Sequence, residues 1–67
     1  MAQDYVSIEA ERVVRESASG KAVLFVIDGE DVWIPRSQIH EPEDIKMGSL
    51  NVLFEVAEWF AKQEGLI

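Results

Sequence analysis

The chain has 67 residues, no cysteine, one histidine and a formal net charge of −7, so it forms one small domain without disulfides, a thiolate zinc site or a histidine cluster. Its excess of acids opposes non-specific binding to the phosphates of nucleic acids. The longest apolar run, AVLFVI, is far shorter than the roughly 20 residues that cross a bilayer, and the first residues lack the segments of a signal peptide. We therefore expect a soluble, cytoplasmic protein that does not act at membranes.

Residues 5–16 have the pattern of a half-buried strand. Apolar and polar side chains alternate between Val6 and Ala10, which is the period of a strand with one buried face. The alternation breaks where Val13 and Val14 are adjacent, so we expect a bulge or bend that keeps one face buried on both sides of it. The segment SASG that follows is typical of a turn.

A tight hairpin is predicted next. Residues 21–27 are apolar on both faces, which is typical of a central strand. Asp28 and Gly29 then accept the positive φ values of a two-residue turn, so residues 31–35 return antiparallel to the preceding run. In the returning strand Trp33 points away from its apolar neighbours, and it lies either under the C-terminal helix or on an open face of the sheet.

The segment DVWIPRSQI, from Asp31 to Ile39, ends this strand. Pro35 lacks an amide hydrogen and fixes its own φ, so strand pairing stops there. We expect a short turn or a single 3₁₀ turn after it, with Ser37 bonded to local backbone and Ile39 returning to the core. Arg36 is expected to face solvent, so that its loss barely affects folding.

Two interpretations are open for the C-terminal third. Residues 50–56 alternate as a β-rich strand does, whereas Ser49 could cap one long helix that runs to Glu64. The alternation favours the strand. In both cases AEWFAKQEGL is helical, Gly65 stops the helix, and Trp59 lies in or beside the core.

Together these elements predict an α+β, mainly β fold: a small antiparallel sheet of about four strands, partly closed like a barrel, with one C-terminal helix. The whole chain, residues 1–67, is one domain. The polar loop before the last strand is expected to have one or two apolar anchors, Ile45 and Met47. Because AVLFVI is apolar on both faces and one short helix does not cover the sheet, we expect a homodimer or larger assembly.

No combination of residues predicts catalysis, a metal site or a cofactor. His40 has Ser37 and Glu41 nearby in sequence, but a catalytic triad is defined by geometry and not by adjacency. The segment EPED at residues 41–44 lacks the glycine and the spaced ligands of a calcium loop. We therefore expect a protein that is not an enzyme. Aromatic residues are enriched at interfaces, and the candidate binding residues are Trp33, Arg36, Ser37, Gln38 and Trp59.

Two segments resemble a group of short bacteriophage and prophage proteins. The resemblance covers roughly residues 21–67 and lies in a hairpin ending in VWIPRSQI and a helix ending in EWFAKQEGLI. It implies a phage-related origin and brings no activity with it. The matching positions are Trp33, Ile34, Pro35, Arg36, Ser37, Gln38, Trp59, Ala61, Gly65 and Leu66.

A weaker likeness relates VWIP-S to the Src-homology barrel that binds proline-rich peptides. In that family an asparagine and an aromatic residue follow the serine and complete the peptide groove. Gln38 and Ile39 stand in that stretch here, and the acidic-aromatic motif that opens the family's sequence is missing. The likeness therefore concerns the fold and not the ligand.

The leading functional hypothesis is a small acidic interaction domain, phage-related, that binds a host or phage protein through an acidic and aromatic surface. Its carboxylates would meet a basic partner surface, such as one that normally holds nucleic acid. Four of the six basic residues lie in the first 36 residues, which predicts a mixed face and an acidic face. One alternative is a barrel that binds single-stranded nucleic acid on Trp33 beside Arg12, Arg15 and Arg36. The other is a self-associating structural module.

Overall fold

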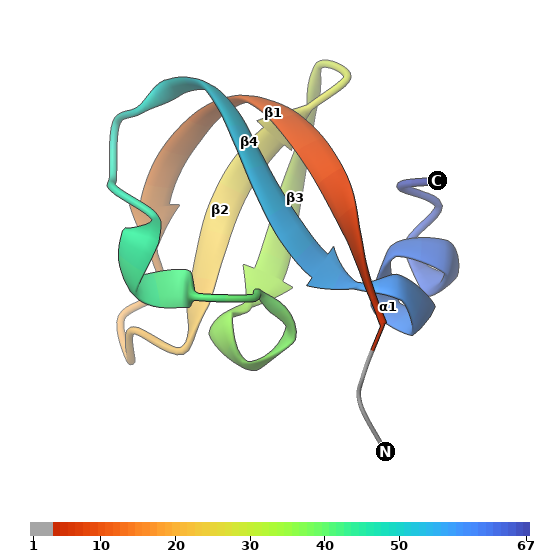
Figure 1. Ribbon diagram of the computed structural model, residues 1–67. Coiled ribbons are helices and arrows are strands. Elements are labelled where there is room, and N and C mark those ends of the chain that lie inside the picture. Colours follow the sequence, from red (N-terminus) through yellow and green to blue (C-terminus); the bar gives the residue numbers. More distant parts are fainter. Residues whose placement is uncertain (1–3) are drawn as a thin grey trace.

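The computed structural model describes residues 4–67 as one four-stranded antiparallel sheet, in the order β3-β2-β1-β4, with a short C-terminal helix (Figure 1). No helix in this part of the chain has the length and apolar character needed to cross a membrane. The predicted sheet of about four strands with one helix is confirmed. The elements are β1 (Tyr5–Glu16), β2 (Ala22–Ile27), β3 (Glu30–Pro35), the 3₁₀ turns η1 (Arg36–Gln38) and η2 (Pro42–Asp44), β4 (Leu50–Ala57) and α1 (Glu58–Gln63).

Strand β1 folds the sheet onto itself. Its N-terminal part pairs with β4 and its C-terminal part pairs with β2. The register with β2 shifts between Val13 and Arg15, so Val14 is the extra residue of the expected bulge. A bulge bends its strand, and β1 curves across β2 and β3 in Figure 1. The buried residues Ile8, Ala10 and Val13 all lie before this bulge, and Arg15 and Glu16 after it are exposed.

The hydrophobic core fills the space between the β1–β4 half and the β2–β3 half of the sheet. Phe25 of β2 stacks on Phe54 of β4, with ring centroids 4.3 Å apart and ring planes 13° from parallel. Burial of such apolar surface is the main driving force for folding. The buried cluster comprises Ile8, Ala10, Val13, Val23, Phe25, Ile27, Ile34, Ile39, Phe54, Val56, Ala57, Phe60 and Ala61.

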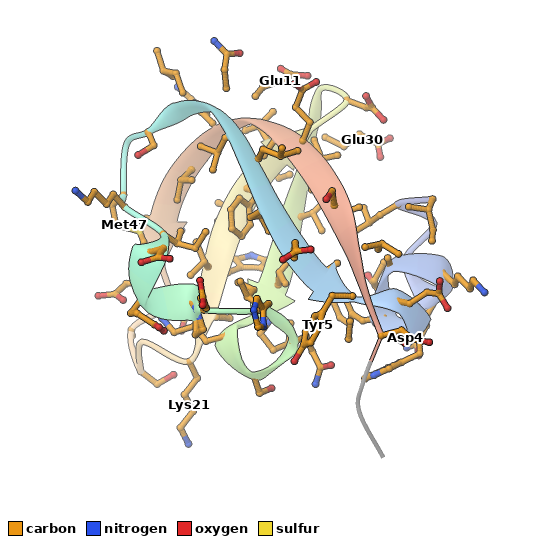
Figure 2. The ribbon with its side chains drawn as sticks, viewed as in Figure 1. Asp4, Tyr5, Glu11, Lys21, Glu30 and Met47 are labelled. Carbon is orange, nitrogen blue, oxygen red and sulfur yellow. The ribbon has the colours of Figure 1, made fainter. Side chains whose placement is uncertain are left out.

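The predicted hairpin joins β2 to β3. Asp28 and Gly29 have φ values of 52° and 77°, as a type I′ turn requires, and the strands pair from Ile27↔Glu30 onward. The Gly29 N–H also donates to the Glu11 carboxylate at 2.8 Å. Figure 2 shows Glu11 and Glu30 at this end of the molecule. The returning strand spans Glu30–Pro35.

The sheet is strongly curved but is not closed into a barrel. After β3 the chain makes the predicted 3₁₀ turn η1 and returns to the edge of β4. There Ile39 forms an isolated antiparallel bridge with Val56, and the His40 N–H donates to the Glu55 carbonyl at 2.8 Å. Ile39 is 4% exposed, which confirms that it returns to the core.

The strand interpretation of residues 50–56 is confirmed, and α1 follows β4 without a loop. Phe60 and Ala61 are buried and dock α1 on the core. Gly65, at φ 71°, ends the helix as predicted. The Leu66 N–H donates to Ala61 O at 2.8 Å and the Gly65 N–H to Lys62 O at 3.2 Å, the two hydrogen bonds of a Schellman motif. Leu66 then packs against the core.

Candidate interaction surfaces

Trp33 lies on an open outer face of the sheet and not under the helix. It pairs directly with Leu24 of β2, which in turn pairs with Arg15 of β1. The Arg15 guanidinium carbon is 5.9 Å from the centre of the indole ring, a cation–π distance. Leu24 is only 8% exposed because its two neighbours cover it, whereas Trp33 remains 44% exposed. The indole is thus held in place and still accessible.

A second row of side chains continues this face toward the hairpin. Arg12, Val26 and Asp31 are register partners across β1, β2 and β3. Register partners share one side of a sheet. The face therefore combines an aromatic ring, two aliphatic side chains, two cations and one anion, and it matches the predicted mixed face. We call it the Trp33 face; its residues are Arg12, Arg15, Leu24, Val26, Asp31 and Trp33.

Arg36 ties three segments of the chain together. Its Nε donates to Gly20 O at 2.8 Å, one terminal nitrogen donates to Pro42 O at 3.2 Å, and the other donates to the Glu16 carboxylate at 2.8 Å. The side chain is 27% exposed. The expectation that Arg36 faces solvent is wrong, because the turn before β2, the η2 segment and the end of β1 converge on its guanidinium. Three of its five N–H donors are used within the chain.

Ser37 and Gln38, which follow Arg36 in η1, contact each other. The Gln38 Nε2 donates to Ser37 Oγ at 3.4 Å. In residues 4–67 no hydrogen bond joins the Ser37 hydroxyl to backbone, so that expectation is wrong. The Gln38 Oε1 atom is buried without a hydrogen-bond partner in the same part of the chain. Neither side chain extends the Trp33 face.

Trp59 is 52% exposed on α1, so it lies beside the core and not in it. The six-residue helix has one buried side, and Phe60 and Ala61 occupy it. Trp59 packs edge-on against Phe60, with ring centroids 5.9 Å apart and planes at 89°. Trp33 instead contacts Arg15. The five predicted binding residues therefore do not converge on one site.

A second surface, which sequence reasoning missed, is the outer face of β1 and β4. Here Glu9 pairs with Leu53, and Ser7 pairs with Glu55. Leu53 is 71% exposed, the most of any large apolar side chain in residues 4–67. Because cross-strand partners lie about 5 Å apart at Cβ, the Glu9 carboxylate is held beside this exposed leucine.

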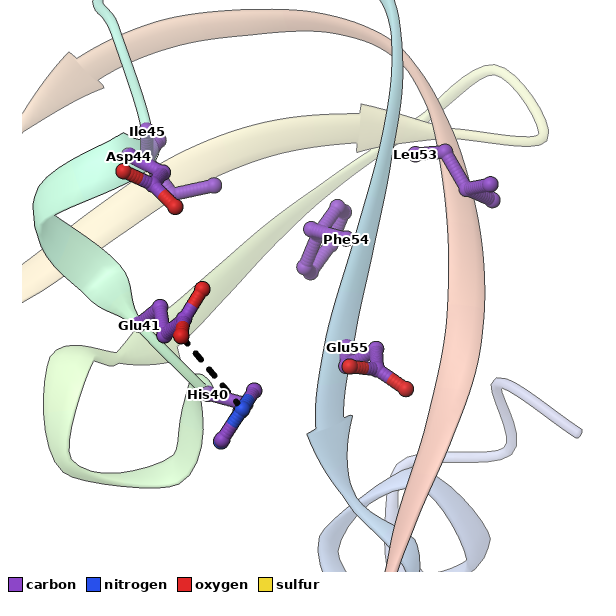
Figure 3. A pocket seen from close by; sticks show the side chains of 7 residues that line it. All are labelled: His40, Glu41, Asp44, Ile45, Leu53, Phe54 and Glu55. Carbon is purple, nitrogen blue, oxygen red and sulfur yellow. Dashed lines mark ion pairs between the residues drawn. The ribbon is translucent and has the colours of Figure 1, made fainter.

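A hollow of about 160 Å³ opens next to Leu53 (Figure 3). Figure 3 shows the side chains of the segment before β4 on one side of it and β4 on the other, with Phe54 turned toward the hollow and Leu53 and Glu55 turned away from it. The His40 ring lies 4.7 Å from the Tyr5 ring, and its Nε2 is 3.9 Å from a Glu41 oxygen. The lining includes three carboxylates and neither lysine nor arginine: it comprises His40, Glu41, Asp44, Ile45, Leu53, Phe54 and Glu55.

We call this acidic and aromatic region the Leu53 surface. Within residues 4–67 no group of three histidine, aspartate or glutamate side chains is arranged to hold a metal ion. What the surface offers is an exposed apolar side chain among anions, which suits non-covalent contact with an apolar and cationic group. Its residues are Tyr5, Glu9, His40, Glu41, Asp44, Leu53 and Glu55.

Part of this surface had a signal in the sequence. The alternation that predicts β4 places Leu53 on the outer side with Asn51 and Glu55. The same alternation wrongly places Leu50 inside, since it is 69% exposed. Met47 is 40% exposed and is not an anchor, whereas Ile45 packs on the core as expected.

Comparisons of this chain with protein-family models, with curated proteins and with solved structures found no match. The likeness to phage proteins therefore stays a prediction.

Proposed function

We propose that the protein is a small, non-enzymatic interaction domain that binds a basic segment of another protein on the Leu53 surface. The observation that supports this most strongly is Leu53 itself, 71% exposed in the middle of β4. An exposed apolar side chain gains free energy when a partner covers it. The carboxylates around it select a partner that carries lysine or arginine.

The geometry defines the partner more closely. Glu9 lies across the strand pair from Leu53, and Glu55 follows two residues later on the same side of β4. Glu41 and Asp44 line the hollow next to these residues. An apolar side chain flanked by basic ones would cover Leu53 and place its cations among these carboxylates. Such pairing adds specificity and a faster association rate more than raw affinity.

The net charge and the predicted origin fit the same proposal. A formal charge of −7 on a 7.6 kDa domain attracts basic surfaces over distance. A host or phage protein whose basic surface normally holds nucleic acid is the partner class that this chemistry favours, because carboxylates can occupy sites that accept phosphates.

A synthetic peptide of Lys-Leu-Lys-Gly repeats tests the proposal by calorimetric titration. We expect binding that weakens as salt is added, and we expect Leu53→Ser and Glu55→Gln each to weaken it further. Met47→Ser is the matched control, because Met47 is 40% exposed outside the Leu53 surface. A Glu-Leu-Glu-Gly peptide should not bind. Equal affinities of the wild type and Leu53→Ser for the cationic peptide would overturn the proposal.

Single-stranded nucleic acid is the second candidate ligand, and the Trp33 face favours it. Trp33 offers a partly exposed ring for base stacking, and Arg15 lies over it at 5.9 Å with Arg12 in the next row. Stacking platforms of this kind bind single strands when a basic groove accompanies them. Here Arg36 is used within the chain and the net charge is −7, so protein binding is the stronger proposal.

A further inference from the structure

Strand β3 presents unpaired backbone groups at the edge of the sheet. The closing pair of a two-residue hairpin, Ile27↔Glu30 here, exchanges hydrogen bonds, and hydrogen-bonded pairs alternate along an antiparallel ladder. The N–H and C=O groups of Asp31 and Trp33 therefore point away from β2. No backbone hydrogen bond outside the ladders of residues 4–67 involves either residue.

The other edge of the sheet, along β4, is partly covered by the chain itself. Ile39 and His40 cover part of the β4 edge, through the Ile39 bridge and the His40–Glu55 hydrogen bond. Proteins usually protect an edge strand with lysine, proline or a bulge. Strand β3 has Pro35 only at its last position and places the 44% exposed Trp33 at its centre. This edge is suited to strand addition.

We infer that β3 pairs antiparallel with β3 of a second copy, with Trp33 on the two-fold axis. In this register Trp33 exchanges both of its outward backbone hydrogen bonds with Trp33 of the other copy. The Asp31 N–H donates to the Pro35 carbonyl of the other copy, a pairing that needs no N–H from the proline. The two sheets become one continuous sheet.

Side-chain chemistry selects this register. On the core side Val32 faces Ile34 of the other copy, apolar against apolar. On the outer side the two indoles meet, each beside the Arg15 of its own chain. Moving the axis to Val32 would instead set the Glu30 side chain against Ile34. Aromatic pairs of this kind stabilise adjacent strands.

This dimer forms along the β3 edge, whereas the proposed function uses the Leu53 surface. Dimerisation and peptide binding should also respond to salt in opposite directions. Each copy carries −7, so the copies repel each other over distance, and added salt screens that repulsion. Dimerisation should therefore strengthen with salt, whereas binding of a cationic peptide should weaken. The two proposals can fail independently.

Sedimentation equilibrium over a wide concentration range, at low and moderate salt, tests the dimer. We expect the apparent mass to rise from 7.6 kDa toward twice that value, and at lower concentration when salt is added. Asp31→Pro removes an outward N–H without breaking the β2–β3 ladder and should weaken dimerisation about tenfold or more. Leu53→Ser on the opposite surface is the control and should dimerise as the wild type does.

Amide hydrogen exchange on the wild-type chain decides the question even where a variant fails to fold. The Asp31 and Trp33 amides should exchange slowly at concentrations where the dimer forms and quickly in dilute protein. A mass of 7.6 kDa at every concentration and salt would overturn the inference. So would a dimer in which these two amides stay unprotected, because another surface would then hold the copies together.

Discussion

Replacing Arg36 with alanine should destabilise the fold severely, although its sequence context is that of a surface turn. The guanidinium donates to two carbonyl oxygens, of Gly20 and Pro42, and to the Glu16 carboxylate. Two of the segments that it joins, the turn before β2 and η2, lie outside the strands, and the third is the end of β1. Loss of the side chain breaks all three contacts together and leaves the Gly20 and Pro42 carbonyls without this donor.

The magnitude follows from the individual contacts. Each hydrogen bond to a carbonyl contributes about 1 kcal/mol. The ion pair contributes about 0.5 kcal/mol, because the Glu16 side chain is 50% exposed and solvent screens it. Arg36→Ala should therefore lower the free energy of unfolding by about 2–3 kcal/mol. The total stability that a core of this size supplies is roughly 3–5 kcal/mol. For a domain of this length the loss corresponds to a fall in Tm of about 10–20 °C.

Thermal and urea unfolding, followed by circular dichroism, measure this loss. Glu16→Gln is the matched control, since it removes the charge pair alone and should cost less than about 1 kcal/mol. Arg36→Lys should fall between the two, because one ammonium group cannot reproduce the planar fork of donors. If Arg36→Ala unfolds within about 0.5 kcal/mol of the wild type, the range of a neutral surface substitution, the structural role given to this residue is wrong.

Three further predictions concern single side chains and one ligand. Trp33→Ala should lower the free energy of unfolding in urea by about 1–2 kcal/mol, because the ring is 44% exposed. Loss of a fully buried aromatic side chain costs roughly 3–5 kcal/mol. A loss of that size would place the ring in the core. Phe25→Ala removes the fully buried partner of Phe54, and the variant should show no cooperative thermal unfolding. A thermal transition like that of the wild type would show that the Phe25–Phe54 stack is not essential to the core. Random single-stranded DNA should not quench tryptophan fluorescence at physiological salt, and a micromolar Kd would promote the nucleic-acid alternative.

Local patterns in the sequence predicted most of the fold. Asp28 and Gly29 specify the turn through their tolerance of positive φ, and the adjacent Val13 and Val14 mark the bulge because they break the alternation of β1. Pro35 marks the end of β3, of which it is the last residue. Each of these features depends on residues within a few positions of one another, which explains why a single sequence is enough to find them.

The candidate sites could not be predicted as well, because they depend on contacts distant in sequence. Arg36 reaches Glu16, 20 residues away, and no local pattern indicates that contact. Trp59 was expected in or beside the core from its size, and it lies beside the core because the short helix buries Phe60 and Ala61 instead. The outward position of Leu53 followed from alternation, but its acidic neighbourhood required the pairing of β4 with β1.

A titration of ¹⁵N-labelled protein with the Lys-Leu-Lys-Gly peptide, followed by amide and indole chemical shifts, tests the proposed interaction surface most directly. The two tryptophans give separate indole reporters away from that surface. We predict shift changes centred on Glu9, Leu53 and Glu55, with the Trp33 and Trp59 indoles unaffected. Changes centred on the Trp33 indole, with residues 53–55 unmoved, would contradict the proposal and move the binding site to the Trp33 face.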